Sequence, residues 1–316
     1  MSERQNSQKA FMLRCQLPSG TFRLAPHSDV INPYFTNIAL TALVELGEAD
    51  AVMRHLMWYL NHVTPRGYVN DFRLRGEEEC DTGKADSEDS YHATFFSLLR
   101  VWIERTDHPD WPAGVHDKLA DMLRALLRLQ QPDGLTWAKG SWRVKYLMDN
   151  CEVAQGLADA SWIFARLGDG ELAGLALEKA EQCRQGILSA YSVKKQCFPV
   201  YDRVLPNWRK WYPDATSQAF PILYGIIPAA GPIASHLYGC LTEHFPYYDS
   251  FITGDFFPWM VMGEWADKMG DRERCVRMLE QAEQLYVYGP RQRYWLLHEA
   301  GRFLRLSRQT GMQLPD

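Results

Sequence analysis

The sequence predicts an all-α fold, an (α/α)6 toroid in which helical hairpins close into a ring, with short extended loops at its mouth. Six apolar segments have the pattern of helices that begin with polar or acidic residues, and a more amphipathic helix follows each of the first five. The six leading helices would run parallel inside the ring, so their N-termini would meet at one mouth. These segments open near Pro33, Ser87, Asp149, Asp214, Asp255 and Pro290.

The first hairpin is predicted at residues 33–45 and 50–63. The segment before it is expected to be irregular, with a short extended piece at 17–24. Gly47 follows the first helix as a C-terminal stop, and a Thr-Pro-Arg-Gly turn ends the second. The charged segment 68–84 then makes a connection long enough to be a candidate functional loop.

The second and third hairpins are predicted on either side of an extended loop. This loop has turn chemistry at Pro132-Asp133-Gly134 and alternation around Trp137 and Trp142, which favours a small β-hairpin. Gly168 ends the inner helix of the third pair. The four helices are expected at 87–105, 114–130, 149–166 and 171–191.

The second half of the chain is predicted to complete the ring. An irregular aromatic stretch, residues 197–212, precedes a helix that Pro228 ends. No linker rich in Gly, Ser or Pro divides the chain, so residues 1–316 are expected to form one domain. Either the sixth outer helix is missing, or the N-terminal segment takes its place. The helices of this half are expected at 214–226, 232–244, 255–269, 272–286 and 290–308.

Composition argues against several classes of function. The formal net charge is −5, with 34 basic and 39 acidic side chains and no basic block, which argues against nucleic-acid binding. No apolar run predicts a membrane span or a signal peptide. Seven singly scattered cysteines favour a reduced compartment, and we expect a cytoplasmic protein. Dinucleotide, P-loop and HExxH motifs are absent from the sequence, so neither a cofactor nor a metal is expected.

Acidic residues gather at three of the predicted inner-helix starts. Each cluster alone is explained by helix capping, because acids near an N-terminus suit the helix dipole. All three together, each with aromatic neighbours, favour a shared acidic mouth. Breaking a glycosidic bond requires such a pair, in which one carboxyl group donates a proton and the other activates water or stabilises positive charge. The clusters are Asp86, Glu88 and Asp89, then Asp149 and Glu152, then Asp214.

Two of these segments resemble known enzymes. Residues 87–99, SEDSYHATFFSLL, resemble the segment that carries the general acid in family 8 glycoside hydrolases. Residues 146–160, YLMDNCEVAQGLADA, resemble the Asp-led inner helix of those enzymes and of unsaturated glucuronyl hydrolases. Family 8 glycoside hydrolases and unsaturated glucuronyl hydrolases both belong to the six-hairpin glycosidase-like toroids. The resemblance implies that Glu88 is the proton donor and that Asp149 is a substrate-binding or acid/base carboxylate.

Two further carboxyl groups are candidates on their position alone. Asp89 is the second candidate for the acid, and Asp214, which has no counterpart in the resemblance, is a candidate base.

The expected partner is a carbohydrate held by residues around the mouth. Aromatic side chains offer flat apolar faces on which sugar rings stack. Arg143 and Lys145 would pair with an acidic sugar, although solvated charge on a hairpin is the simpler explanation. The expected substrate-binding residues are Tyr34, Tyr91, Trp142, Arg143, Trp208, Trp211, Tyr212 and Gln218.

Three other functions stay open. A sugar epimerase or isomerase on the same barrel would use two histidines as acid and base, and His92 and His298 fall on predicted inner helices. The segment LLRLQQPDGLTW resembles the Gln-Asp-Gly-Trp repeats of terpene cyclases, another toroid family. A glycan-binding protein without catalysis would keep the aromatic funnel and would not need carboxyl groups at working distance.

Overall fold

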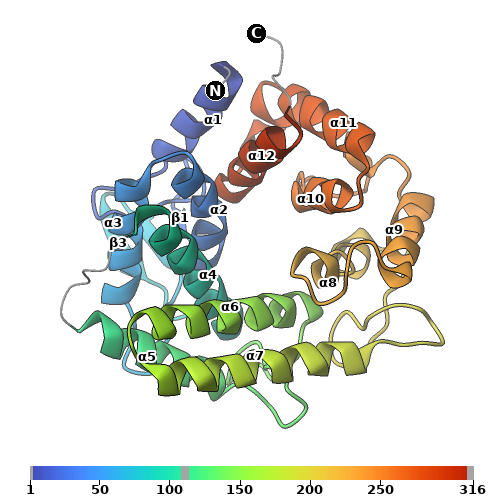
Figure 1. The fold of residues 1–316 in the computed structure, drawn as a ribbon. Coiled ribbons are helices and arrows are strands. Elements are labelled where there is room, and N and C mark those ends of the chain that lie inside the picture. Colours follow the sequence, from blue (N-terminus) through green and yellow to red (C-terminus); the bar gives the residue numbers. More distant parts are fainter. Residues whose placement is uncertain (1–2, 108–113, 312–316) are drawn as a thin grey trace.

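The computed structural model describes residues 3–107 and 114–311 and confirms the all-α toroid (Figure 1). Six inner helices contact one another in chain order, and the last of them returns to the first, so the ring closes. Within the described ranges, no helix is both long and apolar enough to cross a membrane. The inner helices are α2 (Pro33–Glu45), α4 (Glu88–Thr106), α6 (Leu147–Arg166), α8 (Phe220–Leu223), α10 (Val261–Lys268) and α12 (Leu297–Gln309).

An outer helix follows each of the first five inner helices, as predicted. The inner and outer layers enclose an apolar core in which large side chains such as Tyr59, Phe164 and Trp265 are fully buried. The outer helices are α3 (Ala49–Asn61), α5 (Val115–Leu127), α7 (Gly170–Ala190), α9 (Pro232–His244) and α11 (Arg272–Ala282).

The N-terminal segment is helical rather than irregular, which corrects one prediction. Helix α1 (Glu3–Leu13) packs against α12 and takes the sixth outer position. Its sequence is mostly polar, so the helical pattern is weak. Tertiary contacts hold it instead: Met12 is fully buried, and Gln8 Oε1 accepts a hydrogen bond from Trp295 Nε1 at 2.8 Å.

Local sequence explains where the first inner helices begin and end. Asn32 caps α2 because its Oδ1 accepts the N–H of Phe35 at 2.9 Å, and Pro33 occupies the first turn, where no N–H donor is needed. Gly47 after α2 and Gly168 after α6 have φ of +84° and +80°, which residues with a Cβ rarely adopt.

The helix predicted at 214–226 is broken, which is a second correction. Residues Trp211–Ala215 form a kinked turn in which Tyr212 has extended backbone angles, φ −111° and ψ 137°, and the α8 helix that follows has only four residues. Pro221 lies inside the predicted helix and has no N–H to donate, so a continuous helix over 214–226 would lack a backbone hydrogen bond there.

The last two inner helices start later than predicted. α10 begins at Val261 rather than at 255, because Pro258 lacks an N–H and Trp259 has a positive φ of 49°. α12 begins at Leu297 rather than at 290, after a 3-10 turn at Gln292–Tyr294. Residues 255–260 and 290–296, which the sequence predicted as helical, instead precede the N-termini of α10 and α12.

The charged connection 68–84 contributes two strands of a small antiparallel sheet. The strands β1 (Val30–Ile31), β2 (Phe72–Arg75) and β3 (Glu78–Asp81) are ordered β1-β2-β3. Arg73 pairs with Val30 on one side and with Cys80 on the other. Because β1 leads directly into α2, the sheet places Asp71, the residue before β2, beside the start of that helix.

Small residues let the inner helices approach one another closely. A Cβ at Gly156 of α6 would lie 2.4 Å from the Cα of Ala93 in α4. A Cβ at Gly301 of α12 would lie 2.8 Å from the carbonyl oxygen of Ala39 in α2. Both contacts leave no room for a side chain, so these glycines determine how tightly the ring closes.

Candidate active site

Two aspartates meet at the N-terminal ends of α4 and α6. Ser87, the residue before α4, places its Oγ 2.7 Å from Asp89 Oδ1 and 2.6 Å from Asp149 Oδ2. Asp89 is fully buried, whereas Asp149 keeps part of its surface exposed. Asp149 is therefore the member of the pair that a ligand in the mouth can reach.

The hydrogen-bond pattern requires a proton on this pair. A serine hydroxyl carries one hydrogen, so Ser87 can donate to only one of the two carboxyl groups at these short distances. The other contact is a hydrogen bond only if its carboxyl group donates to Ser87 Oγ. Asp89 and Asp149 consequently cannot both be ionised while this arrangement holds.

The environment of the pair favours the protonated state. Burial raises the pKa of Asp149 to about 6; the Ser87 hydrogen bond opposes this rise, and the charge of Asp86 adds to it. Burial and then the charge of Asp149 raise the pKa of Asp89 well above its ordinary value. A carboxyl group that still holds its proton near neutral pH is the form needed for general acid catalysis.

The loop before α6 supports Asp89 from behind. Thr136 Oγ1 donates to Asp89 Oδ2 at 2.6 Å, and the Thr136 N–H donates to Asn150 Oδ1 at 2.7 Å. Gly134 lets this loop pack against α7, because a Cβ there would lie 2.1 Å from the Gln182 carbonyl oxygen. The loop that contains the turn predicted at Pro132-Asp133-Gly134 thus supplies Thr136, a hydrogen-bond donor to the buried Asp89.

A third aspartate joins the mouth from the sheet. Asp71 Oδ1 accepts from Tyr91 Oη at 2.7 Å and from Asn32 Nδ2 at 2.9 Å. Burial raises the pKa of Asp71 to about 6; the hydrogen bond from Tyr91 opposes this rise, and the charge of Asp86 adds to it. Tyr34 stacks on Tyr91 with ring centroids 5.9 Å apart, so both predicted tyrosines lie at this side of the mouth.

Tyr34 also forms a hydrogen bond to the buried glutamate Glu152. Its Oη donates to Glu152 Oε1 at 2.7 Å, and Tyr224 Oη approaches the same oxygen at 3.3 Å. Glu152 is 1% exposed. Burial raises the pKa of Glu152 well above its ordinary value, and the charge of Asp149 adds to the rise.

On the opposite side of the ring, the pKa of Glu299 is lowered rather than raised. Glu299, in the first turn of α12, accepts the N–H of Met260 at 2.8 Å and lies 3.4 Å from His298 Nε2. Burial alone would raise the pKa of Glu299, but His298, the Met260 N–H and Arg302 together lower it. Since α6 is the third inner helix and α12 the sixth, Asp149 and Glu299 start from opposite helices of the ring.

Exposed aromatic side chains line the rim. Tyr212 is 53% exposed and packs on Trp259 with centroids 4.8 Å apart. Burial raises the pKa of Tyr212, and the charge of Asp149 adds to the rise, which places the ring within electrostatic reach of the pair. Trp142 is 52% exposed, and its Nε1 donates to Tyr146 Oη at 3.0 Å, just before α6.

Two predicted catalytic residues lie apart from this pair. Glu88 accepts the Gly140 N–H at 3.2 Å and lines a different cavity, together with Arg66 and Tyr68. Asp214 accepts the N–H of Asn207 at 2.6 Å, within its own loop. The three predicted acids 88, 149 and 214 are therefore not gathered around one hydrogen-bonded centre.

Four predicted substrate-binding residues also have other surroundings. Trp211 is buried against Phe245, and Gln218 is fully buried with its side chain bonded to the backbone of Phe198. Trp208 is half-buried and faces His244 at 5.9 Å.

Arg143 lies over the ring of Trp137 at 4.7 Å. Lys145, the other basic residue of this loop, pairs with Asp133 at 2.5 Å, so its charge is already satisfied.

Sequence reasoning missed Ser87 as a bridge, Asp71 and Glu299. Asp71 is one of several acids in the charged loop 68–84, and Glu299 follows His298 on a predicted inner helix without an acidic cluster at its start. Among the described residues, no group of three or more His, Cys, Asp or Glu side chains is placed to hold a metal ion.

Comparison with known proteins shows the fold and leaves the family open. No family model matches the chain, and no curated protein matches it. A wild-type glycosidase is similar in structure, with a TM-score of 0.74 and 15% identity over 98% of this chain and 96% of that one. An α-mannosidase from Streptococcus pneumoniae, of a metal-independent family and in complex with α-1,6-mannobiose, has a TM-score of 0.72 and 11% identity over 98% and 95%. An α-amylase from Clostridium perfringens has a TM-score of 0.65 and 11% identity over 99% and 98%.

Proposed function

We propose that the protein is a glycoside hydrolase that cleaves glycosidic bonds at the mouth formed by the inner-helix N-termini. One observation carries the proposal: Ser87 joins two carboxyl groups that must share a proton, and only Asp149 of the two is partly accessible. Similar folds in a glycosidase, an α-mannosidase and an α-amylase support the class of reaction.

In this proposal Asp149 is the general acid. It donates its proton to the oxygen of the scissile glycosidic bond, and Asp89 keeps that proton available through Ser87. Two carboxyl groups held close together favour a neutral acid, because two adjacent negative charges repel each other.

Glu299 is the proposed partner. It would accept a proton from the water that attacks the anomeric carbon, and the groups that lower its pKa keep it ionised for that task. Environments that move the pKa values of two carboxyl groups in opposite directions are typical of an acid and base pair. Tyr212 and Trp142, the exposed rim aromatics, would stack on sugar rings.

Substitution of Asp149 tests the proposal. The first substrates to try are aryl α-glucosides and α-mannosides, maltooligosaccharides and α-1,6-mannobiose, since two similar proteins are named for α-linked glycans. The Asp149→Asn variant should lose about 10²–10⁴-fold in kcat, the contribution typical of a positioned general acid, while its melting temperature stays near that of the wild type.

Glu88→Gln is the matched control, because it removes a carboxylate from the same end of α4 that lies in a different cavity. It should retain activity. If Glu88→Gln abolishes turnover and Asp149→Asn does not, the proton donor suggested by the sequence resemblance replaces Asp149.

The epimerase alternative is not favoured by the arrangement of the histidines. His92 is fully buried, and its two ring nitrogens contact the backbone carbonyls of Glu88 and Gly67 at 2.6 and 2.5 Å. A histidine occupied on both sides is not free to exchange protons with a sugar.

A further inference from the structure

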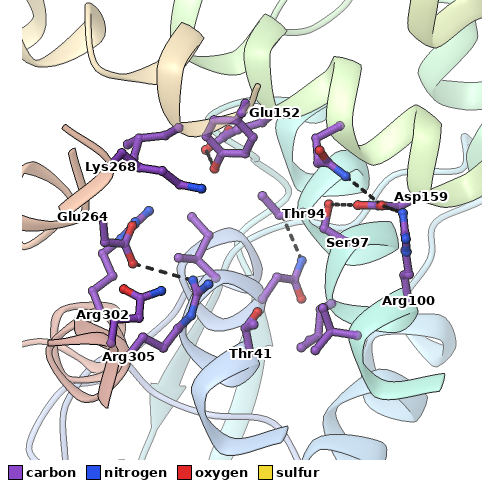
Figure 2. A pocket seen from close by; sticks show the side chains of 18 of the residues that line it. Thr41, Thr94, Ser97, Arg100, Glu152, Asp159, Glu264, Lys268, Arg302 and Arg305 are labelled. Atoms are coloured by element: carbon purple, nitrogen blue, oxygen red, sulfur yellow. Dashed lines mark hydrogen bonds and ion pairs between the residues drawn. The ribbon is translucent and has the colours of Figure 1, made fainter. Parts of the chain in front are cut away.

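A cavity lies between the inner helices of the ring (Figure 2). Its volume is about 450 Å³. Apart from Glu264, which is in the first turn of α10, the lining residues on α2, α4, α6, α10 and α12 come after the first turn of their helix. Because the inner helices run parallel, the cavity lies toward their C-terminal ends. Glu152 and Tyr224 line it, and Glu152 accepts hydrogen bonds from Tyr224 and from Tyr34, which belongs to the mouth side.

The positive and negative side chains that line this cavity balance in number. Arg302 forms an ion pair with Glu264, and Arg100 binds Asp159 at 2.8 Å, as Figure 2 shows on opposite sides of the cavity. The lining contains four basic residues, Arg100, Lys268, Arg302 and Arg305, and four acidic residues besides Glu152, namely Glu104, Asp159, Glu264 and Asp267. A site with this balance has no net attraction for an anion or a cation.

Two buried oxygen atoms on this lining have no hydrogen-bond partner within the described residues. They are Glu152 Oε2 and Glu264 Oε1. Glu152 is 1% exposed, and its other oxygen already accepts from Tyr34 and is approached by Tyr224. Burial raises the pKa of Glu152 well above its ordinary value.

Glu152 Oε2 thus has no hydrogen-bond partner, and Glu264 Oε1 has Arg305 Nη1 beside it at 3.6 Å, which is too long for a hydrogen bond. A buried polar atom left unpaired costs about 1–3 kcal/mol, so both atoms favour a ligand or water in the cavity. A hydroxyl group can satisfy either atom, because it donates and accepts.

We propose that this cavity binds a small uncharged polyhydroxylated molecule, of the size of a mono- or disaccharide, at a site separate from the mouth. The equal numbers of positive and negative charges disfavour a strongly charged ligand, and the two oxygens without hydrogen bonds favour hydroxyl groups. Its volume lies within the range of about 300–1,000 Å³ that is usual for small-molecule sites.

Crystals of the full chain soaked with glucose, mannose or maltose test this directly, because the density places each sugar in the cavity or in the mouth. We expect a sugar within hydrogen-bond distance of Glu152 Oε2 and Glu264 Oε1. Ordered water alone in the cavity at saturating sugar would overturn the proposal, as would inorganic phosphate bound there in preference to sugar.

Calorimetric titration with the same sugars separates the two sites. Thr41, on α2, points toward the cavity in Figure 2, and Thr41→Trp should fill it and weaken the cavity site by about tenfold or more without changing hydrolytic activity. Tyr212→Ala, at the rim of the mouth, should leave the cavity site intact. If Thr41→Trp does not fold, Thr41→Leu and the soaked wild-type crystals still decide the matter.

The outcomes for the two sites are independent. Sugar in the cavity of a protein that hydrolyses no glycoside would support this site and contradict the proposed activity. Hydrolysis with water alone in the cavity would do the reverse.

Discussion

Ser87, Asp89 and Asp149 form the smallest unit from which the proposed chemistry follows. A single hydroxyl between two carboxyl oxygens, at 2.7 and 2.6 Å, couples the protonation of one aspartate to that of the other. Asp86 stands beside them and is exposed, so its charge acts on Asp149 without being buried itself. The pKa of Asp149, the proposed proton donor, therefore depends on Asp86, which does not contact the substrate in this proposal.

The pH dependence of activity tests this coupling. A general acid must be protonated, and the pKa of Asp149 is raised to about 6, so kcat/KM should fall as pH rises through about 6. In the Asp86→Asn variant one source of the raised pKa is gone, so the falling limb should move to lower pH. A profile measured with an aryl glycoside between pH 4 and pH 9 checks both statements. An unchanged limb in Asp86→Asn would separate the observed ionisation from Asp149.

Among the elements, α4 and α6 matter most, because their relative position places Ser87 against Asp149. The two helices touch at Gly156 and Ala93, where a Cβ would approach within 2.4 Å of backbone. The contact lies about two turns from the carboxyl pair on α6. A change in the distance between α4 and α6 would therefore also move Ser87 relative to Asp149, because the helix backbones are rigid.

Gly156→Val should destabilise the protein and loosen the site together. Overpacking of a close helix contact typically costs about 1–3 kcal/mol, and the melting temperature should fall accordingly. Gly174→Ala is the matched control: Gly174 is also helical, in α7, but a Cβ there meets nothing within 4 Å, so this variant should be neutral or stabilised by about 0.4–1 kcal/mol. Thermal unfolding of both variants measures the difference, and equal melting temperatures would contradict the packing argument.

The molecule as a whole is held by contacts between its two ends. α12 packs on α2 and on α1, so the last inner helix touches the first inner helix and the first helix of the chain. The carboxyl groups proposed as acid and base come from helices three places apart in the ring, and their relation depends on this closure. We propose that residues 1–316 act as a single domain for the same reason.

Closure predicts cooperative unfolding. Differential scanning calorimetry should give one transition, with equal calorimetric and van't Hoff enthalpies, because no hairpin can leave the ring without exposing the faces of its two neighbours. Hydrogen exchange should show α2 and α12 losing protection together. Two transitions, or early loss of protection in α12 alone, would show that the ring divides into independent parts.

Most of the fold could be predicted because its signals are local. Apolar periodicity, Asn32 and Pro33 at a helix start, and Gly47 and Gly168 at helix ends act within a few residues of one another. The predictions failed where non-local contacts decide: α1 is polar and depends on Trp295, nearly three hundred residues away. They also failed where a proline interrupts a predicted helix, as at Pro221 and Pro258.

By itself the sequence determined that the chain forms helical hairpins, and that acids stand at the starts of several inner helices, because both follow from neighbouring residues. Only the tertiary structure decided which acids meet. Glu88 and Asp89 are adjacent in the chain, yet successive residues of a helix point about 100° apart, so one lines a separate cavity and the other joins Asp149. That junction spans 62 residues through Ser87, and it exists only because the ring brings α4 beside α6.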